Sequence, residues 1–171
     1  MDIRPAGPAD AAPIAALLNA LLATTTVEWT DRPYDQEAVQ RWLGDHHVVL
    51  VATDEGDEVI GVAAYGWFRD AGRRPGYRFT VESTVHVRRD HWRGGVGRAL
   101  MERLLEQGRA DGLHVVVAAV DSANTPSIEL HRGLGFAEVA RMPEVGAKFG
   151  RWLDLVLLQR RLDDRPAPDG P

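Results

Sequence analysis

The stretch WRGGVGRAL, residues 92–100, combines glycines and arginines directly before a segment of helical composition. Turns of this kind bind phosphates, because the unpaired amides of a helix's first turn and the positive end of the helix dipole attract anions. Gly95 and Gly97 bracket a single residue, and arginines stand around the turn at positions 88, 89, 93 and 98. The stretch predicts a phosphate site, with an ordinary tight turn carrying solubilising arginines as the alternative.

Two common phosphate motifs do not fit this turn. A P-loop ends in Gly-Lys followed by Ser or Thr, whereas the chain's one lysine, Lys148, lies far along the sequence. A dinucleotide fingerprint needs a third small residue, but Leu100 stands at that position. Asp121, at the end of the next predicted strand, could bind the ribose of a nicotinamide dinucleotide, so this interpretation stays open. Such a fold repeats crossover units of about 30 residues each, and little chain remains after the turn to form them. A diphosphate lying across the helix start fits better.

Two titratable side chains have the chemistry of a general acid or base. Glu82 lies in the middle of the alternating segment at residues 77–87, where desolvation raises a carboxylate pKa. A solvent-facing strand residue is an equally good interpretation of the pattern alone. His131 follows Ser127 by four residues, on the same face of a short predicted helix, and imidazole titrates near neutral pH. The alternative for His131 is a histidine satisfied between a helix and a strand.

Composition excludes several kinds of chemistry. The 171 residues contain no cysteine, which removes disulfides, thiolate metal sites and a cysteine nucleophile. The six histidines show no pairing typical of a metal site, so we expect no metal. A net charge of -5 argues against general nucleic-acid binding. No segment resembles a leader or is long enough to cross a bilayer, so we expect one soluble cytoplasmic domain without membrane contact.

Helical and strand periodicities alternate along the chain and predict an α/β fold. Strands are expected at residues 2–5, 46–54, 59–68, 77–87, 113–121, 136–145 and 150–162. Helices are expected around residues 14–22 and 39–43, around 99–105, and after residue 125, with Asp35 and Thr125 as caps. The order of strand, glycine turn, helix and buried strand predicts a right-handed crossover. The proline-rich tail at residues 164–171 is expected to be disordered.

Four separated stretches carry a family resemblance: TTTVEW, TVESTVHV, GLHVVVAAVDSANTPSIELHRGLGF and VGAKFGRWLDL. Together with the glycine turn they resemble the GNAT family of acetyl-CoA-dependent N-acetyltransferases, and within it the phosphinothricin and methionine sulfoximine acetyltransferase group. The resemblance covers residues 2–162 and implies one domain at residues 1–163. It implies a GNAT-type twisted mixed sheet of six to seven strands, flanked by about four helices, in an α/β (α+β) fold.

The resemblance also implies roles for individual residues. Glu82, in the group's TxES motif, is the expected catalytic base, and His131 stands where many relatives have a tyrosine acid. The residues expected to bind acetyl-CoA are Val85, His86, Val87, Arg93, Gly94, Gly95, Val96, Gly97, Arg98, Asn124 and Ser127. The residues expected to bind the acceptor are Trp29, Arg69 and Arg78, because an aromatic wall and guanidinium groups suit an amino acid.

Some positions depart from the family pattern. Trp92 stands where the family has Gln or Arg, with Arg93 one place later. Trp67 falls where related sequences often have an acidic residue, so the resemblance does not imply which acceptor side chain is preferred. Lys148, Phe149, Gly150 and Trp152 resemble the group's dimer-proximal loop, so we expect a homodimer.

The expected function is acetylation of the amino group of a small amino acid or analogue, by direct attack on acetyl-CoA. The thioester is already activated, so no enzyme nucleophile is required, which agrees with the absence of cysteine. The alternatives are a non-catalytic acetyl-CoA sensor and an NAD-type oxidoreductase.

Overall fold

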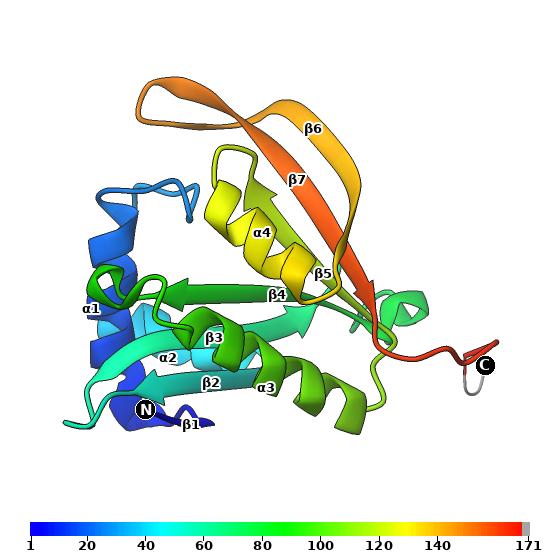
Figure 1. The fold of residues 1–171 in the computed structure, drawn as a ribbon, viewed down its shortest axis with the longest axis horizontal. Helices are drawn as coiled ribbons and strands as arrows, with labels where there is room; N and C mark the ends of the chain where they lie inside the picture. The colour runs from blue at the N-terminus through cyan, green and yellow to red at the C-terminus, as the bar shows by residue number, and fades with distance from the viewer. Residues whose placement is uncertain (169–171) are drawn as a thin grey trace.

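A mixed sheet with the strand order β1-β2-β3-β4-β5-β7-β6 runs through the computed structural model, which describes residues 1–168 (Figure 1). Its strands are β1 (Asp2–Pro5), β2 (Val48–Thr53), β3 (Val59–Trp67), β4 (Thr80–Val87), β5 (Val115–Asp121), β6 (Ala137–Lys148) and β7 (Arg151–Arg161). The α-helices are α1 (Ala11–Leu22), α2 (Gln36–Asp45), α3 (Val96–Ala110) and α4 (Thr125–Gly133). The described residues thus confirm the expected α/β fold, with seven strands and four α-helices.

The strand pairing is mainly antiparallel. β1 pairs with β2, and β2, β3 and β4 form the meander that the alternating patterns predict. α3 then connects β4 to β5 as the expected crossover, and these two strands pair in parallel. β7 lies antiparallel between β5 and β6. This topology differs from that of a dinucleotide-binding fold, which has a run of parallel strands.

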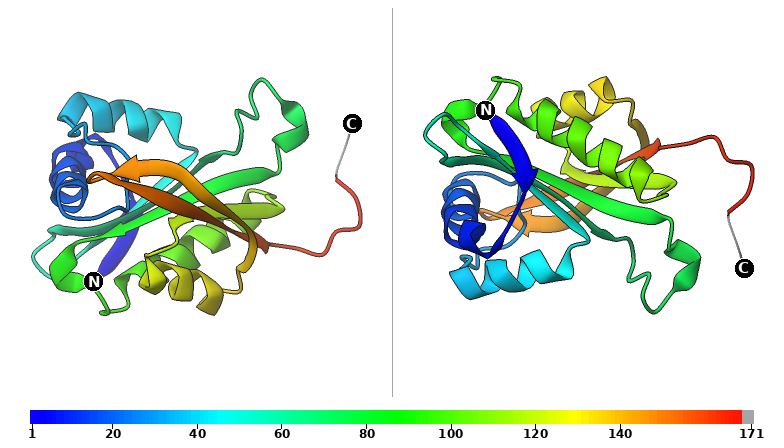
Figure 2. Two further views of the ribbon diagram at one scale, coloured as in Figure 1. Left: turned by 90° about the horizontal axis from the view of Figure 1, so that it is seen from above. Right: turned by 90° about the horizontal axis from the view of Figure 1, so that it is seen from below.

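The helices cover both faces of the sheet, as the two views of Figure 2 show. α1 and α2 pack on one face, over Val51 and Val62. α3 packs on the other face with α4, over Ala63 and Val81. The apolar residues that predict α1 are all buried: Ile14, Leu17, Leu18, Leu21 and Leu22. Because successive strand residues point to opposite faces, Glu82 and the other even-numbered residues of β4 belong to the α1–α2 face.

β4 and β5 separate beyond Ser83 and Ala118, where their parallel pairing ends. β4 continues beside β3 as far as Val87, and β5 continues beside β7 as far as Asp121. The edges that face each other at residues 84–87 and 119–121 therefore lack a neighbouring strand. Backbone donors and acceptors at these edges need other partners, so the opening is a place for a ligand.

Helix caps agree with the sequence prediction in one case and differ in another. The Asp35 side chain accepts a hydrogen bond from the Ala38 amide at 2.7 Å and caps α2, as predicted. The prediction of Thr125 as the cap of α4 is wrong, because Asn124 occupies that position and accepts from the Ser127 amide at 3.3 Å. Asparagine and threonine both suit a cap, with asparagine preferred, and Thr125 becomes the first helical residue.

The C-terminal part of the chain continues the two long strands. β6 extends beyond the expected end at residue 145 to Lys148, and β7 follows after a tight turn. Arg165 donates to the Gly112 carbonyl at 2.7 Å and to Asp163 at 2.6 Å, so the beginning of the tail rests against the domain. Residues 169–171 of the expected disordered tail lie outside the described residues, and disorder over 164–171 stays a prediction.

Gly61 allows the first turns of α3 to lie close to β3. A Cβ atom at this position would lie 2.9 Å from Leu100 Cδ1 and 3.1 Å from Val96 Cγ1, both of them buried side chains of α3. We predict that Gly61→Ala lowers the free energy of unfolding by about 1–3 kcal/mol, the usual cost of overpacking a core. Urea denaturation measures this change.

The matched control is Gly44→Ala in α2, where no atom lies within 4 Å of an added Cβ. Alanine restricts the unfolded chain more than glycine does, so this variant should gain roughly 0.5–1 kcal/mol. Unchanged stability of Gly61→Ala would contradict the close contact between α3 and β3.

Candidate active site

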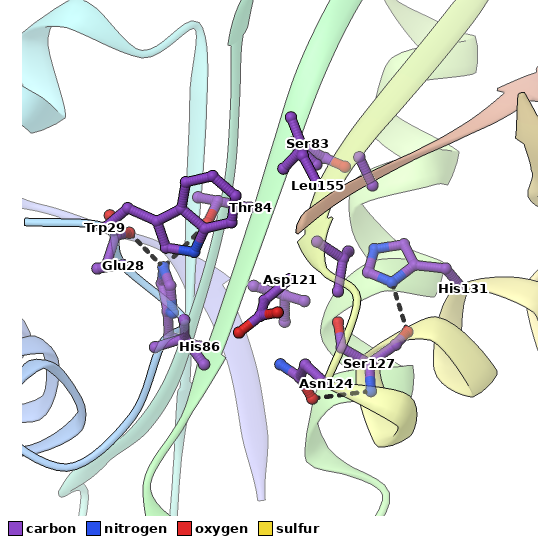
Figure 3. Close-up of a pocket in the computed structure, with 15 residues that line it drawn as sticks. Glu28, Trp29, Ser83, Thr84, His86, Asp121, Asn124, Ser127, His131 and Leu155 are labelled. Atoms are coloured by element: carbon purple, nitrogen blue, oxygen red, sulfur yellow. Dashed lines mark hydrogen bonds and ion pairs between the residues drawn. The ribbon is translucent and has the colours of Figure 1, made fainter. Parts of the chain in front are cut away.

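A cavity of about 260 Å³ occupies the opening between β4 and β5 (Figure 3). Residues 83–86 of β4 and 118–121 of β5 line its two sides. The remaining lining residues are Val27, Glu28 and Trp29 after α1, Asn124, Ser127 and His131 on α4, and Leu155 on β7. Since α1 and α4 cover opposite faces of the sheet, the cavity receives side chains from both faces.

His131 reaches the cavity from α4, as expected, and only 3% of the residue is exposed. Its Nδ1 lies 2.8 Å from the Ser127 carbonyl oxygen, and because a carbonyl only accepts, Nδ1 is the donor. Burial lowers the pKa of His131, and the hydrogen bond to Ser127 opposes this effect in part. The imidazole is therefore neutral near pH 7 and presents Nε2 as a proton acceptor.

Residues 27–29 line the cavity on the α1 side as part of the segment at residues 23–29, the α1-side wall, and polar contacts attach this segment to both strands. The Thr26 hydroxyl donates to the Asp121 carboxylate at the end of β5. Glu28 Oε1 lies 3.1 Å from His86 Nε2 on β4. Trp29, the expected aromatic wall of the acceptor pocket, lines the cavity beside them.

The His86 side chain has a larger place in the site than sequence analysis gave it. His86 was expected to bind acetyl-CoA, and its imidazole lines the cavity while the residue is 5% exposed. Nε2 lies 2.9 Å from Thr84 Oγ1 as well as near Glu28. Nδ1 is buried and has no hydrogen-bond partner among the described residues.

The Asp121 carboxylate is occupied by contacts within the chain. One oxygen accepts from Thr26, and the other accepts from the Ala123 amide at 3.0 Å. Asp121 was a candidate for the ribose of a dinucleotide, but these bonds give it the role of holding residues 23–29 against β5.

The glycine turn precedes α3 as predicted. Gly95 is the cap residue and has a φ of 84°, a left-handed conformation that glycine adopts without strain. The first hydrogen bond of the helix runs from the Ala99 amide to the Gly95 carbonyl, so the amides of residues 96–98 have no intrahelical partner. Arg93 and Arg98 are both exposed beside this turn, and Arg98 also pairs with Glu102 at 3.5 Å. The turn therefore supplies a cluster of free donors at the positive end of a helix.

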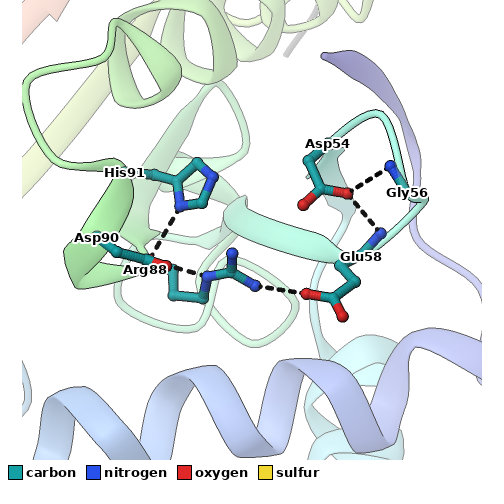
Figure 4. Close-up of polar contacts among 6 residues, drawn as sticks. All are labelled: Asp54, Gly56, Glu58, Arg88, Asp90 and His91. Carbon is teal, nitrogen blue, oxygen red and sulfur yellow. Dashed lines mark hydrogen bonds and ion pairs between the residues drawn. The ribbon is translucent and has the colours of Figure 1, made fainter.

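Residues 88–92 fix the chain just before the turn. Arg88 donates to Glu58 at 3.0 Å and to Asp90 at 2.9 Å (Figure 4). Hydrogen bonds from His91 and Arg88 lower the pKa of Asp90 to about 2. The indole N–H of Trp92 donates to the Val87 carbonyl at 2.7 Å. The side chains of Arg88 and Trp92 thus attach the turn to the sheet.

Glu82 lies on β4 opposite Gly66 of β3, outside the set of residues that line the cavity. Its side chain is accessible to solvent, yet the protein around it removes enough water to raise the pKa of the carboxyl group. It shares the α1–α2 face of β4 with Thr84 and His86, which do line the cavity. The structure therefore places the candidate base beside the cavity.

The arginines expected to bind the acceptor lie on a projecting segment between β3 and β4 (Figure 2). The Arg69 guanidinium lies 5.8 Å from the centre of the Tyr77 ring, and that of Arg78 lies 4.5 Å from the centre of the Phe79 ring. Neither arginine lines the cavity. Their contact with an acceptor stays a prediction.

The other residues expected to contact acetyl-CoA fall into two groups. Val85, Asn124 and Ser127 line the cavity, in agreement with the expectation, although the Asn124 side chain is also the cap of α4. Val87 packs with the core beneath α3, and its carbonyl accepts from Trp92, so its amide is the part available to a ligand.

Lys148 belongs to the stretch that resembles a dimer-proximal loop, and its own side chain turns into the domain. It is 8% exposed, whereas the neighbouring Phe149 and Trp152 are 58% and 68% exposed. Glu28 lines the cavity and was not among the predicted site residues, and Thr26 and Lys148 hold its segment through hydrogen bonds to Asp121 and to the Glu28 carbonyl. No local pattern identifies these residues, because their partners lie far away in the chain.

Two classes of feature are absent from the part of the chain that the structure describes. No group of three or more His, Asp or Glu side chains is arranged to hold a metal ion. None of its helices has the length and apolar character needed to cross a membrane.

Comparison with known proteins agrees with this geometry. Residues 14–136 match the acetyltransferase (GNAT) family. The chain is 46% identical to an L-methionine sulfoximine/L-methionine sulfone acetyltransferase from Pseudomonas aeruginosa, with 98% of each chain covered. A solved structure from Salmonella typhimurium with its cofactor acetyl-CoA has a TM-score of 0.93 and 41% identity, covering 99% of this chain and 98% of that one.

A phosphinothricin acetyltransferase from Sinorhizobium meliloti, solved in complex with acetyl-CoA, is also similar. It has a TM-score of 0.91 and 31% identity, and the match covers 99% of this chain and 92% of that one. These matches exclude the NAD-type oxidoreductase, as the antiparallel pairing of the sheet already indicated. The chain belongs to the GNAT family and is an acetyltransferase.

Proposed function

We propose that the chain transfers the acetyl group of acetyl-CoA to the amino group of a small amino acid or an analogue such as methionine sulfoximine or phosphinothricin. The opening between β4 and β5 carries this proposal, because free strand edges and free helix amides meet there beside a cavity lined by titratable groups. The names of similar proteins, which describe acetylation of amino-acid analogues, support the same acceptor class.

Acetyl-CoA fits the residues around the opening. Its diphosphate requires donors, which the amides of residues 96–98 supply at the positive end of a 15-residue helix. Its pantetheine arm contains amide groups, for which the free edge of β4 at residues 84–87 offers partners. When bound, it supplies the acetyl group as an activated thioester.

Glu82 is the proposed base for the acceptor amine. Transfer forms a C–N bond and breaks a C–S bond, so the amine must lose a proton and the sulfur must gain one. Glu82 lies on the α1–α2 face of β4, and its raised pKa brings it closer to neutral pH than an ordinary carboxylate. A base on this face accepts the proton of an amine that enters between β4 and residues 23–29.

His131 is the proposed proton carrier on the opposite, α4 side of the opening. Its Nδ1–H is committed to the Ser127 carbonyl, and Nε2 is unprotonated. His131 therefore takes up a proton from water in the cavity before it donates that proton to the leaving sulfur, and Glu82 returns the proton of the amine to solvent. The lowered pKa of His131 makes its donation to the sulfur favourable.

The acceptor's own recognition is proposed to involve Trp29 and the two arginines. Trp29 lines the cavity and supplies an apolar wall for the acceptor side chain. Arg69 and Arg78, on the projecting segment between β3 and β4, are the candidates to bind the carboxylate of the acceptor. Trp67, 41% exposed and 4.9 Å from the ring of His47, lies at the base of that segment.

A thiol-release assay with acetyl-CoA tests the proposed function. Amino acids, methionine sulfoximine and phosphinothricin are offered singly as acceptors, and mass spectrometry identifies the acetylated product. Turnover with at least one amino acid or analogue is expected. Acetyl-CoA binding without turnover of any amine would instead support a coenzyme sensor.

Removal of the proposed base tests Glu82. Glu82→Gln should lower kcat/KM by about 10²–10⁴-fold, the usual contribution of a general base. Because the base must be deprotonated, wild-type activity should fall as the pH drops through the raised pKa of Glu82. A pH–rate profile should lack this acidic limb in the variant.

The matched control is Glu55→Gln, which removes an exposed carboxylate in the β2–β3 turn. It should leave the rate and the pH profile unchanged. If Glu82→Gln also kept the wild-type profile, Glu82 would not be the base.

The backbone conformation of the glycine turn provides a test of acetyl-CoA binding. Valine is strained at the left-handed φ of Gly95, whereas asparagine tolerates it. Gly95→Val should move the amides of residues 96–98 and raise the Kd for acetyl-CoA by about tenfold or more, for a strain of about 1–2 kcal/mol. Gly95→Asn should have a smaller effect in titration calorimetry.

Gly112→Val is the control, because Gly112 has a φ of 72° and, as at Gly95, no atom lies within 4 Å of an added Cβ. It lies after the far end of α3 and should lose stability without losing acetyl-CoA affinity. Equal affinity losses in the two valine variants would mean that the turn is not the binding site.

The β6–β7 hairpin supports a further proposal, that the protein is a homodimer; its cytoplasmic location is proposed from the sequence alone. The exposed apolar side chains of the hairpin are Val139, Met142, Val145, Phe149 and Trp152. Clustered exposed apolar residues mark association surfaces.

Trp152→Glu should convert a dimer to a monomer in light scattering, whereas Trp67→Glu, outside the hairpin, should not. A monomeric wild type would contradict the proposal.

A further inference from the structure

Lys148 is the only lysine in a chain with nineteen arginines. It ends β6, and its ammonium group is buried against the end of α1 and the segment that follows. Nζ donates to the carbonyl oxygens of Leu22 at 2.9 Å, Thr25 at 2.9 Å and Glu28 at 2.7 Å. All three protons of the ammonium group therefore have an acceptor.

The geometry of these acceptors accounts for a lysine at this position. An ammonium group directs three donors from one atom, which matches three carbonyls that converge on a point. A guanidinium spreads its donors around a plane and suits a carboxylate or phosphate instead. Leu22 is the last residue of α1, so the cation also lies at the negative end of a helix dipole.

Burial of this cation has a cost that its contacts offset. Desolvation lowers the pKa of Lys148, while the carboxylates of Glu28 and Asp31 raise it. A buried ammonium is stable only when its protons are bonded, and the three carbonyls meet that condition. An apolar side chain would fill the space without fixing the position of residues 22–28.

The segment held by Lys148 is the cavity wall that the acceptor is proposed to contact. The Glu28 carbonyl bonds Lys148, while the Glu28 side chain lies next to His86. The Trp29 ring lies against Gly146, where an added Cβ would be 2.1 Å from Cε3 of the indole. β6 thus contacts this wall at two positions, Gly146 and Lys148.

We propose that Lys148 is a positioning residue that sets the affinity for the amine acceptor. Its three hydrogen bonds fix residues 22–29, and with them Glu28 and Trp29, at the α1 side of the cavity. This inference rests on the proposed function for its kinetic consequence. The fixing of the segment itself is independent of any activity.

The variants Lys148→Met and Lys148→Arg test the proposal. Methionine removes all three bonds, and arginine keeps the charge without the convergent donors. Both should raise KM for the acceptor by about tenfold, since loss of hydrogen bonds to a charged group typically costs at least that factor. kcat at saturating acceptor and the Kd for acetyl-CoA should stay within about twofold of wild type, because the glycine turn is untouched.

Hydrogen–deuterium exchange gives a readout that does not need activity. Amides of residues 22–29 should exchange faster in both variants, with unchanged exchange in α3. Arg161→Met, which removes an exposed cation at the end of β7, is the control and should change neither exchange nor KM. If no amine is acetylated by the wild type, the proposed function fails, while the exchange result still decides the role of Lys148.

Three results would overturn the inference. They are an acceptor KM for Lys148→Met equal to wild type, full recovery of wild-type KM by Lys148→Arg, and unchanged exchange of residues 22–29. Should Lys148→Met fail to fold, Gly146→Ala displaces Trp29 from the same wall and should raise the acceptor KM.

In the wild type, an amine-reactive ester should modify the terminal amine but leave Lys148 unmodified, and rapid modification of Lys148 would contradict its buried position.

Discussion

The parallel pairing of β4 and β5 stops after Ser83 and Ala118, and the functional features of the molecule are arranged around this interruption. A continuous sheet would satisfy its own backbone groups and leave no room for a ligand. Here β3 and β7 support the outer edges of the two strands while their facing edges diverge. The backbone groups freed in this way require partners, so the fold creates a binding site through its topology before any side chain is considered.

The opening has a different chemistry on each face of the sheet. On the α3–α4 face lie the free amides that follow Gly95 and the neutral imidazole of His131. On the α1–α2 face lie Glu82 and the wall formed by residues 23–29. An anionic coenzyme and a small amine can therefore approach the same point from opposite sides. The buried polar contacts of Asp121 and Lys148 hold the wall in place, so the cavity keeps its shape between two separate elements.

Local periodicity was sufficient to predict the strands, the helices and the crossover, because these depend on neighbouring residues. The glycine turn precedes α3, as its residues predict, and His131 reaches the cavity from α4, while the binding and catalytic roles that the resemblance implies for them stay predictions. The contacts of Lys148 could not be predicted, since its partners are backbone carbonyls more than a hundred residues away, whose placement depends on the complete fold. Thr125 was a wrong cap because its neighbour Asn124 satisfies the same local rule. The apolar residues of strands alternate and can be recognised in the sequence, whereas the buried and charged residues of loops follow no periodic pattern.

The account rests on the claim that acetyl-CoA occupies the interruption between β4 and β5. Amide hydrogen exchange of the protein with and without acetyl-CoA tests this claim most directly. Binding should slow exchange at residues 84–87 on the free edge of β4 and at residues 96–98 in the first turn of α3. Protection confined to other elements, with unchanged exchange at both of these sites, would contradict it.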